Sequence, residues 1–127
     1  MTTQAKNKVV VRTILEAIDA GDLGALDAHP GYWQTREVMP MLKAAFPDLR
    51  HAIQMQVAEN DLVATFSIVT GTHQGDFLGV LATGRTVRFQ HLDMDRLVDG
   101  KVMTHNAESG WLSVLLDWGV LPIQKSG

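Results

Sequence analysis

The 127-residue sequence has no cysteine, no long apolar run and no excess of basic residues. Without cysteine there is no disulfide, no thiolate nucleophile and no cysteine-type zinc site, which suits a cytoplasmic protein. No segment approaches the roughly 18 apolar residues of a membrane span, and residues 1–6 lack the apolar stretch of a secretory signal. Eleven Lys and Arg against fourteen Asp and Glu leave a net charge of −3. We therefore expect a cytoplasmic chain that binds neither membrane nor nucleic acid, with a small molecule or a protein as its partner.

The residues that are present indicate one domain over 1–127, since 46% are hydrophobic and the length suits a single core. Apolar residues at helical spacing predict a helix over residues 8–18, and Gly21 follows where a helix-ending glycine is common. A shorter helix is expected after Asp22, and a third over residues 35–46, where Pro40 is tolerated only near the start.

After Pro47 the apolar spacing changes from that of a helix to that of a strand. The alternation predicts strands over residues 49–57, 62–73, 86–98 and 101–108, with Asp99-Gly100 as a tight hairpin turn between the last two. Trp111 begins a final helix. Helices followed by an antiparallel meander predict an α+β fold in which helices cover one face of a curved sheet and leave a cavity.

The hairpin turn also predicts which side chains share a face of the sheet. A regular register pairs three polar residues of one strand with three of the next: His91 with Glu108, Asp93 with Asn106, and Asp95 with Thr104. Two alternatives remain open. Either this polar face is solvated while Leu92 and Met94 pack the core, or Phe89 packs inside and the polar residues line a pocket. A bulge of one residue would reverse the assignment.

Three segments of the sequence carry a resemblance to a known family. They are Ala45-Phe46-Pro47-Asp48-Leu49-Arg50, the stretch Gly71-Thr72-His73-Gln74-Gly75-Asp76-Phe77-Leu78-Gly79, and Arg96 with Asp99-Gly100-Lys101. Over about residues 35–119 the chain resembles the SnoaL-like polyketide cyclases, also known as ester cyclases. This resemblance implies the cone-shaped α+β barrel of the nuclear-transport-factor-like superfamily. It also implies intramolecular aldol closure of a hydrophobic carbonyl compound, or a related isomerisation, without cofactor.

The resemblance also suggests roles for individual residues. In these cyclases a histidine and a carboxylate on the last two long strands face the ligand, and the carboxylate serves as acid and base. Asp93 with His91 fits this pair, and Glu108 would be a second carboxylate across the hairpin. His73 matches the family's Gly-Thr-His-x-Gly motif. The residues expected to contact the substrate are His73, Phe89, Asp95, Asn106 and Trp33.

Four features of the sequence depart from the family. Asn106 stands where a tryptophan is usual and Gly110 where an aspartate is usual. Asp95 stands where an apolar residue is expected, and Phe66 where an arginine is expected. The expected pocket is therefore more polar than is typical. A non-catalytic binding or dimerisation module of the same fold and an epoxide hydrolase-like enzyme remain as alternatives.

Two further expectations concern assembly and metal. The predicted second strand carries an apolar outer face of Leu62, Ala64, Phe66 and Ile68, which favours a homodimer. His91-x-Asp93-x-Asp95 places three metal-binding residue types on one strand face. Because such side chains lie about 6–7 Å apart along a strand, we expect no metal there.

Overall fold

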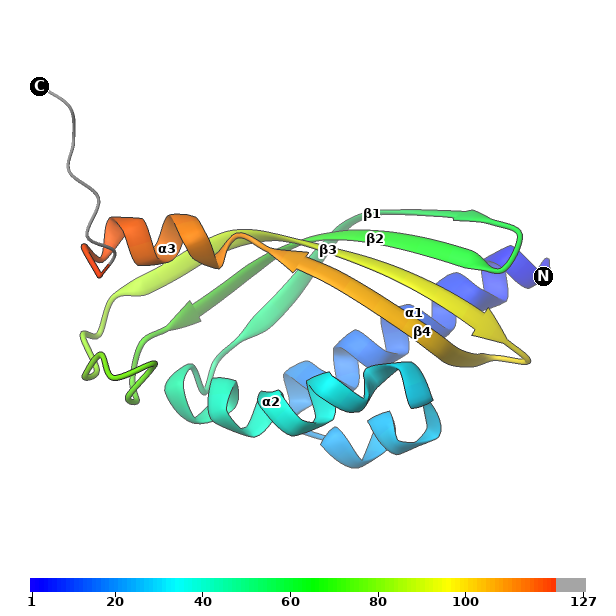
Figure 1. Ribbon diagram of the computed structural model, residues 1–127. Helices are drawn as coiled ribbons and strands as arrows, with labels where there is room; N and C mark the ends of the chain where they lie inside the picture. Colours follow the sequence, from blue (N-terminus) through cyan, green and yellow to red (C-terminus); the bar gives the residue numbers. More distant parts are fainter. Residues whose placement is uncertain (121–127) are drawn as a thin grey trace, which may run out of the picture.

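The structure, a computed structural model, describes residues 1–120 and consists of helices followed by an antiparallel sheet (Figure 1). The elements, in chain order, are α1 (Thr3–Ala20), the 3₁₀ turns η1 (Leu23–Ala28) and η2 (Pro30–Tyr32), α2 (Trp33–Ala45), β1 (Arg50–Glu59), β2 (Leu62–Thr72), β3 (Thr86–Val98), β4 (Lys101–Ser109) and α3 (Trp111–Asp117). No helix within residues 1–120 is both long and apolar enough to cross a membrane.

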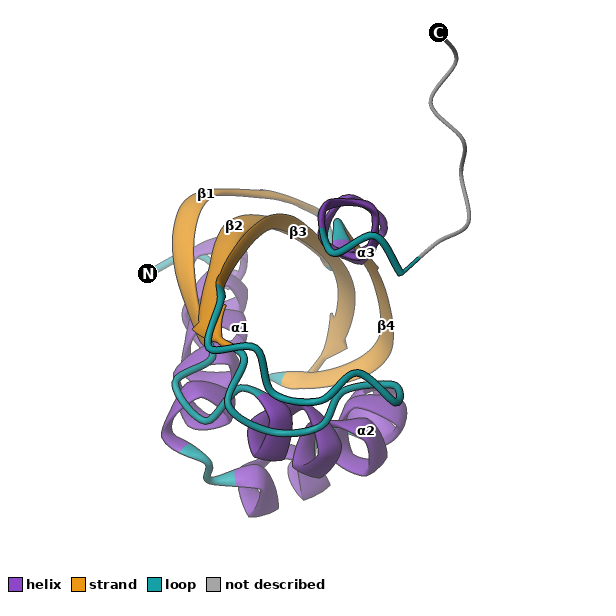
Figure 2. Cartoon of the chain, turned by 90° about the vertical axis from the view of Figure 1, so that its left-hand side faces the viewer, coloured by secondary structure: helices purple, strands orange, loops and turns teal. Residues whose placement is uncertain are grey.

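The sheet is a meander in the order β1-β2-β3-β4, with every neighbouring pair antiparallel. It curves strongly, and viewed along its length it wraps around an interior that α1 and α2 close from the other side (Figure 2). The short helix α3 packs against β3. The predicted α+β plan of helices covering one face of a curved sheet is confirmed.

The helix ends follow local chemistry, with one exception. Thr2 accepts a hydrogen bond from the backbone N–H of Ala5 at 3.1 Å, and Gly21, at φ 79°, ends α1 as predicted. The segment after Asp22 forms 3₁₀ turns instead of an α-helix. The helix α2 begins at Trp33, two residues earlier than expected, so that Pro40 lies in its interior. Pro40 is on the exposed side, where water can solvate the carbonyl group that loses its hydrogen bond.

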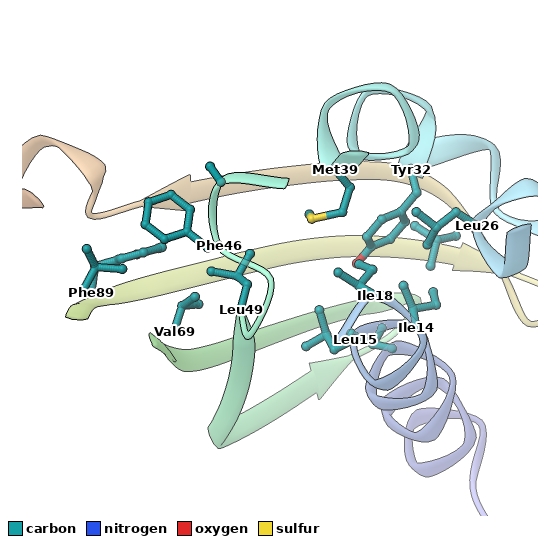
Figure 3. Packing of buried hydrophobic residues seen from close by; sticks show 14 of the residues in the cluster. Ile14, Leu15, Ile18, Leu26, Tyr32, Met39, Phe46, Leu49, Val69 and Phe89 are labelled. Atoms are coloured by element: carbon teal, nitrogen blue, oxygen red, sulfur yellow. The ribbon is translucent and has the colours of Figure 1, made fainter. Parts of the chain in front are cut away.

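The core lies between α1 and the concave face of the sheet. Ile14, Leu15 and Ile18 of α1 point toward this face, and Val69 of β2 and Phe89 of β3 lie on the sheet side (Figure 3). Along β2 the side chains alternate between buried and half-buried, so that Val63, Thr65, Ser67 and Val69 face inward. The prediction that Leu62, Ala64, Phe66 and Ile68 form the outer face of this strand is therefore confirmed.

A β-bulge in the last hairpin changes its register. Val98 pairs with Lys101 and Leu97 with Val102, as a tight turn requires, but Met103 is then skipped and Arg96 pairs with Thr104. Beyond the bulge the pairs are Asp95 with His105, Met94 with Asn106, Asp93 with Ala107, Leu92 with Glu108, and His91 with Ser109. The predicted pairs of His91 with Glu108 and Asp93 with Asn106 are therefore wrong, because one extra residue reverses every later side chain of β4.

Contacts from the 3₁₀ turns hold the bulge in place. His29 Nδ1 accepts the backbone N–H of Val102 at 3.1 Å. Gly31 lies so close to β4 that an added Cβ atom would stand 2.9 Å from the carbonyl carbon of Thr104 and 3.0 Å from that of Met103. The position requires glycine because there is no space for a side chain, and the turn and the bulge thus fit each other.

Candidate functional site

A pocket of about 230 Å³ lies between the concave face of the sheet and the helices α1 and α2. Most of its wall is apolar, with contributions from Leu15, Ile18, Met39, Leu42, Leu49, Val69, Phe89 and Trp111. The polar part of the wall comes mainly from the strands, through His51 of β1, His91 and Asp93 of β3, and His105 and Ser109 of β4. This combination of an apolar cavity with a few convergent polar groups is typical of a small-molecule site.

Asp93 is the central member of the polar side chains that line the pocket. Its side chain is 1% exposed, and its Oδ1 atom lies 2.9 Å from His91 Nε2 and 3.7 Å from His105 Nε2. Its other oxygen, Oδ2, is buried and has no hydrogen-bond partner within the described residues 1–120. A buried acceptor without a partner is costly, so this atom is suited to receive a proton from a ligand.

Each histidine has a second polar partner farther from Asp93. His91 Nδ1 lies within hydrogen-bond distance of Ser109 Oγ. His105 Nδ1 lies 2.6 Å from Asp95 Oδ1, and the Tyr32 hydroxyl donates to Asp95 Oδ2 at 3.3 Å. The result is a continuous polar chain through Tyr32, Asp95, His105, Asp93, His91 and Ser109.

At the Tyr32 end of this series of polar contacts, burial changes the pKa values of two side chains. Burial raises the pKa of Asp95, and the hydrogen bond from His105 opposes that rise. Burial, followed by the nearby charges of Asp95 and Asp93, raises the pKa of Tyr32 well above its usual value. Tyr32 is therefore a protonated donor to Asp95, and its ring stacks on that of His105 with centroids 3.9 Å apart.

The structure brings some of the predicted site residues together and separates others. His91, Asp93 and Phe89 line the pocket, so the alternative in which this face of β3 is solvated is wrong. Asp95 is fully buried behind His105 and does not reach the pocket wall. Glu108 and Asn106 are exposed on the opposite face because of the bulge.

The placement of Trp33 at the pocket is also wrong. Its side chain is 60% exposed and it is not part of the pocket wall. The 3₁₀ turn Pro30–Tyr32 directs the neighbouring Tyr32 into the interior, where it is 1% exposed, and Trp33 then begins α2 on the outside. Adjacent positions of a turn point in different directions, and spacing alone does not reveal which one faces inward.

His73 is buried outside the pocket wall, and its side chain makes its polar contacts with a loop. Its Nδ1 atom accepts the backbone N–H of Thr83 at 3.2 Å and lies 2.9 Å from the Thr83 hydroxyl oxygen. Its ring stacks on Trp118 with centroids 4.5 Å apart. The histidine of the Gly-Thr-His-x-Gly motif thus anchors the segment between β2 and β3.

Three pocket residues are absent from the expected site. A regular register places His105 on the outer face, and the bulge turns it inward. Tyr32 lines the pocket in place of its neighbour Trp33. His51 alternates with polar residues in the same way as the apolar Leu49 and Ile53. This spacing predicts that the histidine faces the interior with them.

The paired histidines and carboxylates of the pocket are arranged for contact with one another. No group of three or more His, Asp or Glu residues within residues 1–120 has the geometry to hold a metal ion. His91 and His105 both direct a ring nitrogen at the same carboxylate oxygen, an arrangement suited to hydrogen bonding and proton transfer.

Known proteins share both the sequence pattern and the fold. Over 86 residues the chain is 31% identical to aklanonic acid methyl ester cyclase DnrD from Streptomyces peucetius, a match that covers 65% of this chain and 59% of that protein. AclR, a proposed hydroxylase from Streptomyces galilaeus, is 30% identical with a TM-score of 0.86 and covers 98% of this chain and 87% of its own. IdmH, a proposed polyketide cyclase from Streptomyces antibioticus, is 28% identical with a TM-score of 0.75. This match covers 89% of the present chain and 98% of the IdmH chain.

The family model of SnoaL-like polyketide cyclases matches residues 10–111, which include the pocket from α1 to the start of α3. The match therefore includes Asp93 and both of the histidines that contact it. The chain belongs to the SnoaL-like polyketide cyclase family.

Proposed function

We propose that the protein catalyses cofactor-free acid/base chemistry on a hydrophobic carbonyl compound, as an intramolecular aldol cyclisation or a related isomerisation. The observation that carries this proposal is the Asp93 carboxylate, which has one oxygen shared by two imidazoles and the other oxygen buried without a partner, at an otherwise apolar pocket.

Aldol closure needs a base near an acidic carbon, a donor for the oxygen that becomes negative, and a site that excludes water. Asp93 Oδ2 is the proposed base, because Oδ1 already contacts His91. His91 and His105 stabilise the negative charge of the carboxylate through their contacts with Oδ1. The apolar wall around Phe89 and Trp111 keeps water from the enolate.

The size of the pocket limits how much of a substrate it encloses. At about 230 Å³ it is smaller than the roughly 300–1,000 Å³ of sites that hold whole drug-sized ligands. We therefore propose that the pocket encloses the reacting end of a larger compound, or all of a smaller one.

The test uses aklanonic acid methyl ester, the compound in the name of the relative DnrD. The purified protein is incubated with it, and the products are separated and weighed by mass spectrometry. A cyclised product of unchanged mass, formed by the wild type and lost by about 10²–10⁴-fold in Asp93→Asn, is the expected result. Glu108→Gln, on the outer face, is the matched control and should keep full activity.

Other outcomes would identify other functions. The similarity to AclR favours hydroxylation as a second candidate, and that reaction would add one oxygen atom and require an oxidant. Addition of water would indicate an epoxide hydrolase-like enzyme. Saturable binding without conversion of any tested carbonyl compound would support a binding module and contradict catalysis.

We also propose that the protein is a homodimer that buries the outer face of the sheet. Leu92 and Met94 of β3 are 45% and 42% exposed there, next to the half-buried Phe66 and Ile68 of β2. An apolar surface that spans neighbouring strands favours contact with a second copy of the same surface.

A further inference from the structure

We propose that His51 is a second catalytic residue of this pocket, which donates a proton to the substrate oxygen, and that Asp19 is its positioning residue. This inference rests on the proposed function, in which Asp93 removes a proton from carbon. The aldol closure leaves a negative oxygen at the carbonyl group that is attacked, and this oxygen needs a donor at a different point of the pocket.

Asp19 holds His51 through both of its carboxylate oxygens. His51 Nδ1 lies 2.7 Å from Asp19 Oδ1, and the backbone N–H of His51 donates to Asp19 Oδ2 at 2.8 Å. The two residues are 32 positions apart, Asp19 in the last turn of α1 and His51 near the start of β1. A carboxylate that binds the backbone and the ring of the same residue fixes the orientation of that ring.

The ring fixed in this way belongs to the pocket wall. The His51 side chain is 7% exposed and lines the same cavity as Asp93. Because Nδ1 is occupied by Asp19, Nε2 is the ring nitrogen available to a ligand. When both ring nitrogens carry a hydrogen, Nδ1 donates to Asp19 and Nε2 can donate to a ligand.

His51 and Asp93 lie on different strands, β1 and β3, and both line the cavity. The rings of His51 and His91 pack edge to face, with centroids 5.3 Å apart and an interplanar angle of 70°. A compound in the pocket can therefore contact the Asp93 group on β3 and the His51 group on β1 at the same time. Two proton-transfer groups at separate positions match the two positions of an aldol closure.

The proton balance of the step is complete. Asp93 takes the proton from the acidic carbon, the carbon–carbon bond forms, and the new alkoxide takes the proton from His51 Nε2. The product has the same atoms as the substrate. Asp93 then releases a proton to solvent and His51 takes one up when the product leaves.

Two variants test the role of His51 in turnover. His51→Asn keeps a side-chain N–H that can donate to Asp19 but removes Nε2, so kcat should fall by about 10²–10³-fold, as is typical for loss of one oxyanion donor, with KM changed much less. Asp19→Asn should also lower kcat. The control for it is Asp27→Asn, since Asp27 is an exposed carboxylate paired with Arg36 outside the pocket. Full activity of His51→Asn beside an inactive Asp93→Asn would overturn the inference and leave the proposed function intact.

Nitrogen NMR of the protein labelled in its histidine rings is a readout independent of turnover. We expect the Nδ1 signal of His51 to be that of a ring nitrogen hydrogen-bonded to a carboxylate, and Asp19→Asn to shift that signal. Benzoylacetone, an aromatic 1,3-dicarbonyl probe, should shift the His51 Nε2 signal on binding. An Nδ1 signal that Asp19→Asn does not shift, or an Nε2 signal unmoved by bound probe, would overturn the inference. A responsive His51 in a protein that converts no substrate would contradict the proposed function, and the catalytic role of His51 with it.

Discussion

His105 Nδ1 lies 2.6 Å from Asp95 Oδ1, directly across the ladder between β3 and β4. This contact exists because Met103 is skipped in the pairing, which turns His105 toward the interior. The same shift takes Glu108 out of the site. A single unpaired residue thus decides that Asp93 is flanked by two imidazoles, with no second carboxylate from β4.

Asp95→Asn tests the role of this contact. An amide oxygen is a weaker acceptor than a carboxylate and orients the His105 ring less firmly, so turnover should fall by about 10²-fold, the lower end of the range for acid/base groups. The measurement is kcat with a confirmed substrate, and Asp27→Asn on the surface provides the control. A variant with wild-type kcat would show that Asp95 has only a structural role.

The same variant has a predicted effect on how stability depends on pH. Because burial raises the pKa of Asp95 above 3.8, the folded state binds more protons than the unfolded state between 3.8 and the folded value. The contribution of Asp95 to stability is therefore complete below pH 3.8 and is lost as the pH rises through the folded value. Urea unfolding between pH 3 and pH 7 should show Asp95→Asn gaining stability relative to the wild type as the pH rises. A constant difference would contradict this.

Asp48→Ala should show the opposite trend. The Thr72 hydroxyl and backbone N–H both donate to Asp48 at 2.7 Å and lower its pKa. This contribution is present above pH 3.8 and is lost as the pH falls through the lower folded value. Since Asp48 is exposed, we expect a loss of about 1 kcal/mol in the free energy of unfolding at pH 7. Asp22→Ala, which removes no side-chain cap hydrogen bond, is the control.

Gly31→Ala should disturb the pocket through the bulge. Its Cβ atom would stand 2.9 Å from the backbone of Thr104, so either the 3₁₀ turn or β4 must shift. We expect a loss of about 1–3 kcal/mol in the free energy of unfolding, which is typical of overpacking. Gly24→Ala meets no atom closer than 3.9 Å and should have a smaller effect. Equal stability of the two variants would show that the turn has more space than the structure indicates.

Leu92→Glu should separate the proposed homodimer. A charge in the middle of an apolar contact is unfavourable, so light scattering at micromolar concentration should give a dimer for the wild type and a monomer for the variant. Leu81→Glu, 79% exposed in the segment between β2 and β3, should remain dimeric. A wild-type monomer would remove the proposal.

Much of the fold was predictable because it depends on local spacing. The alternation from Thr86 to Val98 predicted β3 with its observed bounds, and the Asp99-Gly100 turn predicted the hairpin. The set of β3 residues that share a face, from Phe89 to Asp95, also followed from the sequence, since side chains alternate regularly along a strand. The spacing alone did not place Asp93 at the pocket, because both faces of β3 contain apolar residues. The family resemblance favoured that face.

The sequence by itself determined the order of the elements, their approximate bounds and the neighbours along each strand, because these depend on contacts within a few residues. Only the tertiary structure decided which face of the sheet is inside, where β4 slips by one residue, and that Asp19 meets His51. Each of these depends on packing between segments far apart in the chain: the turn at Gly31 against the bulge, and α1 against β1. A pattern of spacing contains no information about such contacts, and the pocket is built from them.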